Sequence, residues 1–276
     1  MNTTYDTDPT RYETMSTQEL RRTYLIEDLF AKGQIVLRYW VCDRAVVGSA
    51  VPTDAALTLP CPKELAAQYF AERREIGVIN IGGRGSISVD GKAFPLSKLD
   101  CLYIGRDSKQ VVFSSASAAD PAQFYIVSYP AHCSYPTTLT TPAQAEKQEL
   151  GSQQEANHRT IHRCIHLNGI KSCQLVMGYT TLEVGSVWNT MPPHTHPRRS
   201  EIYCYFDQKP HASVIHLMGR PEATRSIIIR NGEAVLSPTW SVHAGVGTSN
   251  YTFIWAMGGE NQVFADMDAA PVDDLR

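Results

Sequence analysis

Short β-rich runs follow one another along most of the chain, and turn-forming residues separate them. The runs lie at residues 77–81, 86–89, 92–94, 102–104, 110–113, 124–129, 173–180, 201–206, 213–218, 226–229, 234–236 and 251–257. Asp90-Gly91 and Asn231-Gly232 are dipeptides typical of two-residue hairpin turns. Many short strands at close spacing predict a mainly β protein built as a sandwich or barrel.

Helical signals are few. Ser16 and Glu19 form a capping box, and apolar residues recur at helical spacing from residue 20 to 29, so a first helix is expected to end near Gly33. Pro62 opens a second helical pattern that runs to about residue 74. A third, short helix is expected within residues 142–150.

A polar stretch at residues 136–157 separates two β-rich halves. We expect a first domain at 1–140, with a helical entry and a barrel, and a second barrel domain at 141–276. The similar strand spacing in the two halves indicates a duplicated fold. The acidic end of the chain, residues 265–276, is expected to be an irregular tail.

Composition limits the classes of partner. The 276 residues are 43% hydrophobic and carry a formal net charge of −3, which argues against nucleic acid or an acidic membrane surface as the main partner. No apolar run is long enough to span a membrane, and the start of the chain does not look like a secretory signal. Seven scattered cysteines form no CxxC pair, which favours a protein of the reducing cytoplasm.

One segment carries residues suited to chemistry. His194 and His196 lie two apart, so on an extended backbone both imidazoles point to one face, and Glu201 opens the next strand. His243 follows about forty residues later. A single histidine is more often solvated or packed than a ligand, but three imidazoles and a carboxylate suit a divalent metal such as Zn, Mn, Fe, Co or Ni.

These motifs resemble those of known proteins. The pattern HxHx4E followed by G-x5-P-x4-H is similar to the two motifs of cupins, which are small β-barrels with a central metal. The string GSVWNTMPPHTH at 185–196, together with RRSE at 198–201 and NHRT at 157–160, resembles the 5-dehydro-4-deoxyuronate isomerases, also called 4-deoxy-L-threo-5-hexosulose-uronate ketol-isomerases. The resemblance extends over essentially the whole chain.

The resemblance implies two cupin-like barrels (a bicupin) with a few short helices, and one zinc ion per subunit in the C-terminal barrel. The implied ligands are His194, His196, Glu201 and His243. Residues 77–129 contain no histidine, so the first barrel is expected to be free of metal. The implied partner is a small keto-uronate, and the implied assembly is a homo-oligomer, a hexamer.

A ketol isomerase needs acid–base groups and, for a uronate, a cation for the carboxylate. Tyr203, on the same strand face as Glu201, and His162 are the candidate acid–base residues. Arg159, Arg163 and Arg199 are the candidates for the carboxylate. Two other classes stay open, a metal-dependent cupin dioxygenase and a sugar-binding cupin without turnover.

Overall fold

The computed structural model describes residues 1–276 and divides into two compact units. The first unit comprises residues 1–4, 28–145 and 164–176, and the second comprises residues 5–27, 146–163 and 177–276. Each unit therefore includes a short segment from the other half of the chain. Residues 5–27, expected in the first half, group with the second unit, and residues 164–176, expected in the second half, group with the first.

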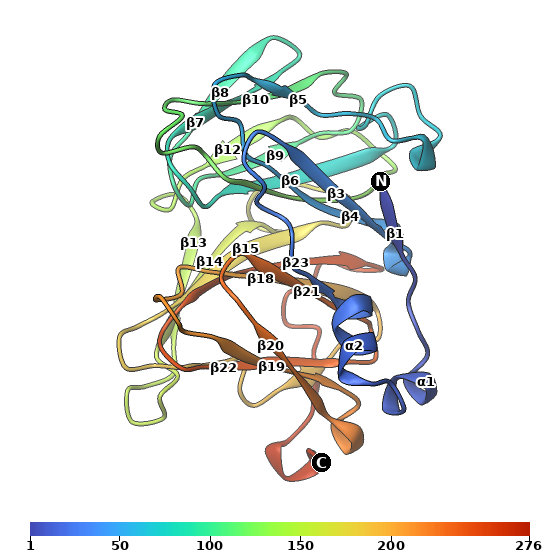
Figure 1. Ribbon diagram of the computed structural model, residues 1–276, viewed down its shortest axis with the longest axis vertical. Helices are drawn as coiled ribbons and strands as arrows, with labels where there is room; N and C mark the ends of the chain where they lie inside the picture. Colours follow the sequence, from blue (N-terminus) through green and yellow to red (C-terminus); the bar gives the residue numbers. More distant parts are fainter. The chain divides into compact units, whose positions relative to one another are not determined.

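The first unit consists of two β-sheets (Figure 1). The larger sheet has the strand order β1 (Asn2–Thr4), β3 (Ile35–Trp40), β4 (Ala45–Ala50), β11 (Phe124–Pro130), β6 (Arg74–Asn80), β9 (Cys101–Ile104) and β12 (Thr138–Thr140). The smaller has the order β5 (Leu57–Thr58), β10 (Val111–Ser115), β7 (Gly85–Val89) and β8 (Lys92–Leu96). Two 3-10 turns complete the unit, η1 (Cys42–Arg44) and η2 (Lys63–Leu65).

Apolar side chains from both sheets form one core in this unit. Val78 and Ile126 come from the larger sheet, and Ile87 and Phe113 come from the smaller one. All four are fully buried. Burial between two facing sheets is the main stabilising term of such a sandwich.

The second unit repeats this layout. Its larger sheet has the order β13 (Glu146–Leu150), β14 (Arg159–Ile165), β15 (Val176–Leu182), β23 (Thr252–Gly259), β18 (Arg199–Phe206), β21 (Glu233–Ser237) and β2 (Leu25–Ile26). Its smaller sheet has the order β16 (Trp188–Asn189), β22 (Val242–Gly247), β19 (Val214–Gly219) and β20 (Arg225–Ile229). A short ladder joins β17 (His194–Thr195) to β24 (Asp268–Ala269). The helical elements of this unit are α1 (Pro9–Glu13), α2 (Thr17–Tyr24), η3 (Pro221–Ala223) and η4 (Val272–Asp274).

The expected mainly β architecture with few helices is confirmed. The Asp90-Gly91 hairpin is confirmed as well, since β7 and β8 pair with Val89 opposite Lys92 and both turn residues have positive φ. Asn231-Gly232 forms a turn but not a hairpin, because β20 and β21 belong to different sheets. A dipeptide signals the reversal of the chain but not the partner of the strand that follows.

The helix predictions are only partly correct. The capping box of Ser16 and Glu19 is present and α2 begins where expected, but it ends at Tyr24 because Leu25 and Ile26 pair with β21. The helix expected at 62–74 is wrong, since only the single turn η2 forms before β6. The helix expected within 142–150 is also wrong, because that segment forms the edge strand β13. Pairing with a sheet overrides a weak helical preference at residues 25–26 and 146–150, whereas residues 66–73 form an irregular loop.

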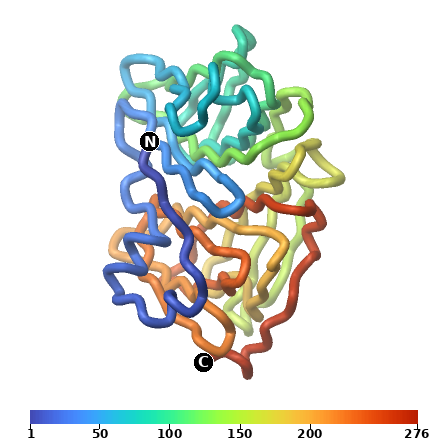
Figure 2. Tube along the Cα trace, turned by 90° about the vertical axis from the view of Figure 1, so that its right-hand side faces the viewer, coloured from blue at the N-terminus to red at the C-terminus, as the bar shows by residue number.

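The C-terminal segment is more ordered than an irregular tail. Figure 2 shows it, in red, leaving β23 and running along one side of the second unit to the C-terminus. Part of it, β24, pairs with β17, so that Ala269 lies opposite His194 and Asp268 opposite Thr195. This segment therefore contributes directly to the surroundings of the HxH motif.

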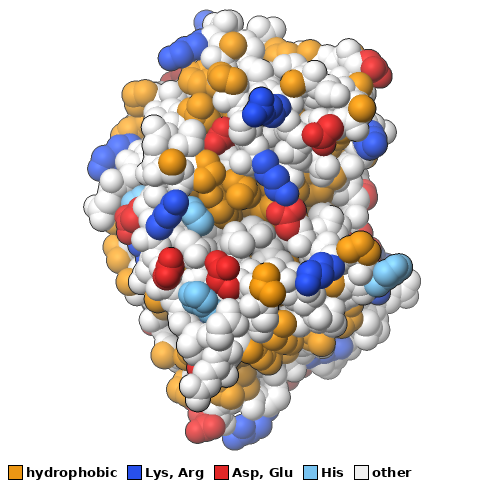
Figure 3. Space-filling view, turned by 90° about the vertical axis from the view of Figure 1, so that its left-hand side faces the viewer, with side chains coloured by type: hydrophobic (Ala, Val, Ile, Leu, Met, Phe, Trp, Pro, Cys, Tyr) orange, Lys and Arg blue, Asp and Glu red, His pale blue; other side chains and the backbone are white.

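The distribution of surface charge and the length of the helices concern two classes of partner, nucleic acid and membrane. On the face drawn in Figure 3, basic and acidic side chains are interspersed rather than gathered by sign. None of the helices is long and apolar enough to cross a membrane.

Candidate metal centre

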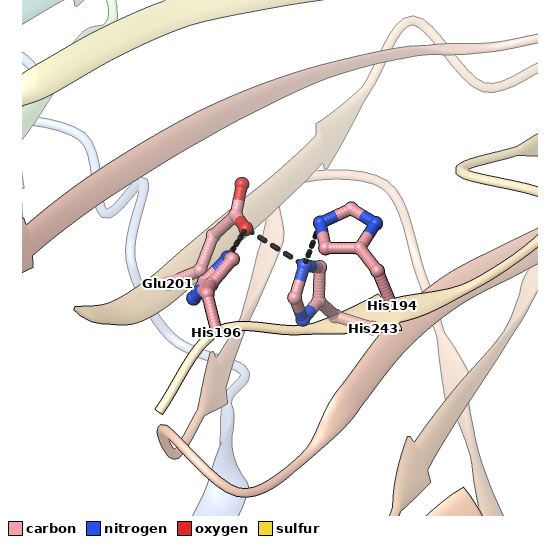
Figure 4. Close-up of side chains that lie close together, drawn as sticks. All are labelled: His194, His196, Glu201 and His243. Atoms are coloured by element: carbon pink, nitrogen blue, oxygen red, sulfur yellow. Dashed lines mark hydrogen bonds and ion pairs between the residues drawn. The ribbon is translucent and has the colours of Figure 1, made fainter. Parts of the chain in front are cut away.

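Four side chains of the second unit converge at one place (Figure 4). His194 lies in β17, Glu201 in β18 and His243 in β22, and His196 lies in the loop between the first two strands. The candidate ligand atoms of all four lie within 4.8 Å of one another. The structure thus brings together the residues that the sequence nominated as ligands, and the cluster can hold a metal ion.

Backbone carbonyls fix the orientation of two of the imidazoles. Nδ1 of His196 lies 2.8 Å from the carbonyl oxygen of Arg199, and Nδ1 of His243 lies 3.2 Å from that of Ser241. A carbonyl oxygen only accepts, so both Nδ1 atoms carry the proton. In the neutral rings, each Nε2 then presents a lone pair to the centre of the cluster, as in a metal-ligating histidine with its supporting hydrogen bond.

The lone pairs face negative charge. Oε2 of Glu201 lies 2.9 Å from Nε2 of His196 and 2.8 Å from Nε2 of His243. Nε2 of His194 lies 3.1 Å from Nε2 of His243. Acceptors packed so closely repel one another unless a proton or a cation lies between them. This donor set of imidazoles and one carboxylate fits a divalent transition metal.

Burial and charge shift the titration of these groups. Burial, assisted by the neighbouring His243, lowers the pKa of His194 to about 3. Burial acts against charge on His196 too, but the hydrogen bond and the charge of Glu201 outweigh it and raise the pKa of His196. Burial would raise the pKa of Glu201, yet the two histidines beside it hold that pKa well below its usual range. The carboxylate is therefore ionised at neutral pH.

A cavity of about 400 Å³ opens beside the cluster. Besides the candidate ligands, three residues that the sequence suggested for catalysis or for carboxylate binding line this cavity: Arg159, Arg199 and Tyr203. Aromatic and aliphatic side chains make up most of the rest of the wall. The volume is in the usual range for a small-molecule site.

Arg199 is the most unusual side chain in this cavity. It is fully buried, and its Nη2 donates to the backbone carbonyl of Asp266 at 2.9 Å. Its Nε and Nη1 have no hydrogen-bond partner. Burial lowers its pKa, and the nearby Glu201 and Asp266 act in the opposite direction. Buried donors without a partner are costly, so this guanidinium is poised to bind an acceptor.

Tyr203 and Arg159 occupy other parts of the wall. The hydroxyls of Tyr203 and Thr190 lie 3.0 Å apart. Burial, followed by the charge of Glu201, raises the pKa of Tyr203 well above its ordinary value, so the phenol is neutral. Arg159 donates from Nη1 to the carbonyl of Asn157 at 2.8 Å, and burial lowers its pKa.

Two nominated residues lie outside the cavity wall. His162 alternates with Ile161 on β14, and its ring stacks on Tyr179 with centroids 4.5 Å apart. Arg163 hydrogen-bonds to Glu146 and Gln148 on the paired strand β13. The guanidinium of Arg163 lies 4.5 Å from the ring centroid of Phe264, a wall residue, so it packs behind the wall, whereas His162 faces the other side of β14.

Sequence reasoning missed several wall residues. Phe264, Ala265, Met267 and Ala269 come from the C-terminal segment, and Phe253, Trp255 and Met257 come from β23. The alternation of β23 was a usable signal, since its odd-numbered residues face the same side. The C-terminal segment carried no such signal, because its place depends on its pairing with β17 and on a distant ion pair between Arg198 and Asp266 at 2.7 Å.

Known proteins resemble the chain in sequence and fold. It is 53% identical over 268 residues to the 4-deoxy-L-threo-5-hexosulose-uronate ketol-isomerase of Caldicellulosiruptor bescii, covering 97% of each chain. It is 52% identical over 273 residues to the protein of that name from Opitutus terrae, covering 99% of this chain and 98% of the relative.

Solved structures agree with the architecture. An IolB-like protein of Salmonella typhimurium superposes with a TM-score of 0.70 at 13% identity, covering 87% of this chain and 94% of that one. An oxalate decarboxylase variant of Bacillus subtilis gives 0.55 at 10% identity, covering 86% and 79%. At these identities the likeness shows the cupin-type β-barrel fold alone. The model of the KduI/IolB family matches residues 26–272, and the chain belongs to that family.

Proposed function

We propose that the protein is a metal-dependent ketol isomerase that converts 5-dehydro-4-deoxy-D-glucuronate to 3-deoxy-D-glycero-2,5-hexodiulosonate in the degradation of pectin and related uronates. The names of its full-length relatives support this reaction. The observation that carries the proposal is one cavity that holds both a buried imidazole–carboxylate cluster and a buried, partly unpaired guanidinium.

The reaction is an internal transfer and needs no co-substrate. One proton leaves C2 and one arrives at C1, while the hydroxyl proton on the C2 oxygen is exchanged for one on the C1 oxygen. A zinc ion, or another divalent transition metal, held by His194, His196, Glu201 and His243 would supply Lewis-acid stabilisation of the negative charge that develops during enolisation.

Arg199 is the proposed partner of the substrate carboxylate. Arg199 and Glu201 are two apart on β18, so their Cα atoms are about 6.6 Å apart on one face of the strand. The carboxylate and C1 of an extended six-carbon uronate are separated by five bonds, or about 6 Å. Because both residues line one cavity, a carboxylate on Arg199 would leave the other end of the substrate in the cavity that holds the cluster, and Arg159 offers a second cation on the same wall.

Tyr203 is the proposed proton donor. It is the only titratable residue in the cavity wall that is neither a candidate ligand nor an arginine. Because its phenol stays protonated at neutral pH, it is suited to donate to an oxygen that gains charge and unsuited to remove a proton from carbon. The apolar wall, including Phe253 and Trp255, would keep bulk water from the reacting carbons.

Turnover of 5-dehydro-4-deoxy-D-glucuronate tests the proposal. The native, chelator-stripped and zinc-restored proteins are compared with His196→Ala. We expect conversion to the 2,5-diketo product by the native protein, loss after stripping and in the variant, and recovery with zinc in the native sequence only. Folded, metal-loaded protein that gives no conversion would overturn the assignment.

The two other classes of cupin predict different results in the same assay. A dioxygenase consumes oxygen in proportion to substrate, and an isomerase consumes none. A sugar-binding protein retains its ligand without turnover and tolerates Glu201→Gln. Measuring dissolved oxygen beside product formation therefore separates all three.

Assembly and location form a separate part of the proposal. Its support is the family membership of the chain. We propose a cytoplasmic homo-oligomer, a hexamer, that binds neither nucleic acid nor membrane. Light scattering after size exclusion checks the assembly, since a hexamer has six times the mass of one chain.

A further inference from the structure

A second group of metal-ligating side chains lies in the first unit. The sulfurs of Cys133 and Cys173 are 3.5 Å apart although the residues are 40 positions apart in the chain. His132 adds an imidazole, and the ligand atoms of the three residues lie within 4.8 Å of one another. Both cysteines are half-buried and His132 is exposed, so the group can be reached from solvent. It shares no residue with the cluster of the second unit.

A buried carboxylate holds one side of this group in place. Glu75 is fully buried and accepts from the backbone amides of Cys173, Gln174 and Leu175 at 2.7, 2.8 and 2.9 Å. The hydroxyl of Tyr103 donates to the same carboxylate at 2.9 Å. Four donors on one buried carboxylate fix the loop that carries Cys173, so the position of this thiol is built into the fold.

Two further contacts tie that loop to the turn after β11. The side-chain amide of Gln174 donates to the carbonyl of Pro130 at 2.7 Å. The thiol of Cys173 donates to the carbonyl of Cys133 at 3.2 Å. The backbone amides and the Gln174 side chain therefore hold the two cysteines facing each other without a covalent bond, and the hydrogen bond from the Cys173 thiol is given up when the ion replaces its proton.

The spacing suits an ion better than a disulfide. Two thiolates on a tetrahedral zinc ion, each with a Zn–S distance near 2.3 Å, are about 3.8 Å apart. A disulfide needs an S–S distance of about 2.05 Å and an oxidant to accept two electrons. Metal binding needs only the loss of two thiol protons, with both sulfurs becoming thiolates on the ion. A soft donor pair with one imidazole favours zinc among the common divalent ions.

We propose that His132, Cys133 and Cys173 form a second metal site, which binds a zinc-like divalent ion through two thiolates and one imidazole. Solvent fills the fourth position. The ion clamps the segment 164–176 to the turn after β11 within the first unit. Its role is structural, and it does not depend on the proposed isomerase reaction.

Cobalt(II) titration of the reduced, metal-free protein tests the site. Thiolate ligands give cobalt an intense near-ultraviolet charge-transfer band, and the cluster of the second unit contains no thiol. We expect two ions per chain and the band in the natural sequence. Cys133→Ser and Cys173→Ser should bind one ion and lack the band. Cys61→Ser, which changes a half-buried thiol elsewhere in the first unit, should retain both.

Two further variants keep the test decisive. His196→Ala should lose one ion and retain the band, which separates this site from the candidate centre of the second unit. His132→Ala alters an exposed side chain and should fold normally, with cobalt affinity for the site lowered at least tenfold. The proposal is overturned if the reduced natural protein shows no charge-transfer band, or if mass spectrometry finds Cys133 and Cys173 joined as a disulfide in reducing buffer.

Discussion

Nε2 of His243 lies 2.8 Å from Oε2 of Glu201, and the Nδ1 proton of the same ring is directed at the carbonyl of Ser241. The ring therefore turns an acceptor towards a carboxylate, a contact that is favourable only with a proton or a cation between the two atoms. A divalent cation bound to both atoms would satisfy this contact, which supports the proposed metal centre. The same contact also indicates which substitutions are informative.

Replacing His243 by glutamine should lower the zinc affinity of this centre by at least about 100-fold, because the loss of a direct ligand should exceed the 10–100-fold effect of losing a supporting group. The matched control is His162→Gln, which changes a half-buried histidine outside the cavity wall. Competition for zinc with a chromophoric chelator measures the zinc affinity of both variants. Equal affinities in the two variants would contradict the assignment of His243 as a ligand.

Arg199→Lys should raise KM for the uronate with a smaller effect on kcat. A lysine keeps the charge but loses the planar pair of donors, and hydrogen bonds to charged groups contribute about 1.5–3 kcal/mol, or roughly 10- to 150-fold in KM. Arg163→Lys is the comparison, since that guanidinium is held by Glu146 and Gln148 behind the wall residue Phe264. Steady-state kinetics of the two variants give the answer. A larger loss in Arg163→Lys would move the carboxylate site to β14.

The parts of the site that follow local patterns were predictable from the sequence. His194, His196 and Glu201 lie close in the chain, so a short loop between two extended segments is enough to bring their side chains together. The distant candidate ligand, His243, was predicted from the spacing of the glycine and proline that precede it. The mainly β class followed from the density of short runs and turn residues.

The parts of the fold and of the cavity wall that the sequence did not predict depend on pairing between distant segments. Residues 146–150 are polar and carry no strand pattern, yet they pair with β14 from Glu146 opposite Arg163 to Leu150 opposite Arg159. The wall formed by Phe264 and Met267 depends on the pairing of β24 with β17. Such contacts are set by the completed sheet, and a single sequence contains no local signal for them.

Tyr203→Phe should lower kcat by about 100-fold, the lower range for loss of a general acid, with zinc affinity unchanged. Thr190→Val removes the hydroxyl that lies 3.0 Å from that of Tyr203 and serves as the companion variant. A role in proton donation predicts a large effect of the first variant and a small effect of the second on kcat. Unchanged kcat in Tyr203→Phe would exclude the phenol as the donor.

The capping box of α2 should make stability depend on pH in the acid range. Hydrogen bonds from the backbone and side chain of Ser16, with help from Arg11, lower the pKa of Glu19 to about 2. A depressed folded-state pKa gives a stabilisation that is complete above the unfolded value of about 4.5 and is lost as pH falls towards 2. Glu19→Ala should therefore reduce the free energy of unfolding at pH 7, and the difference should narrow below pH 4.5.

Urea unfolding of both proteins between pH 7 and pH 3 measures this difference. Glu13→Ala, which changes an exposed carboxylate in α1, is the control. The contrary outcome is that the Glu19 variant and the natural protein differ in free energy of unfolding by the same amount at every pH. That result would show that the carboxylate charge plays no part in the cap.

Asp266 should matter for substrate binding although its own side chain does not line the cavity. Its carboxylate accepts from Arg198 and Asn261, and these hydrogen bonds, that of Arg198 first, hold its pKa well below the usual range. Its backbone carbonyl accepts from Arg199. Asp266→Asn should loosen the segment that carries Phe264 and Met267, and so raise KM a few-fold, the scale of an exposed ion pair, with kcat little changed.

Asp268→Asn provides a matched control for this prediction, because Asp268 makes one contact with Arg198, at 3.1 Å, and is more exposed. Hydrogen exchange should show faster exchange in residues 260–267 of the Asp266 variant and no change in the control. Because the carboxylate of Asp266 stays ionised below the ordinary aspartate pKa, exchange in this segment of the natural protein should be insensitive to mild acid beyond the intrinsic effect of pH. Faster exchange without a change in KM would show that the segment covers the cavity without positioning Arg199.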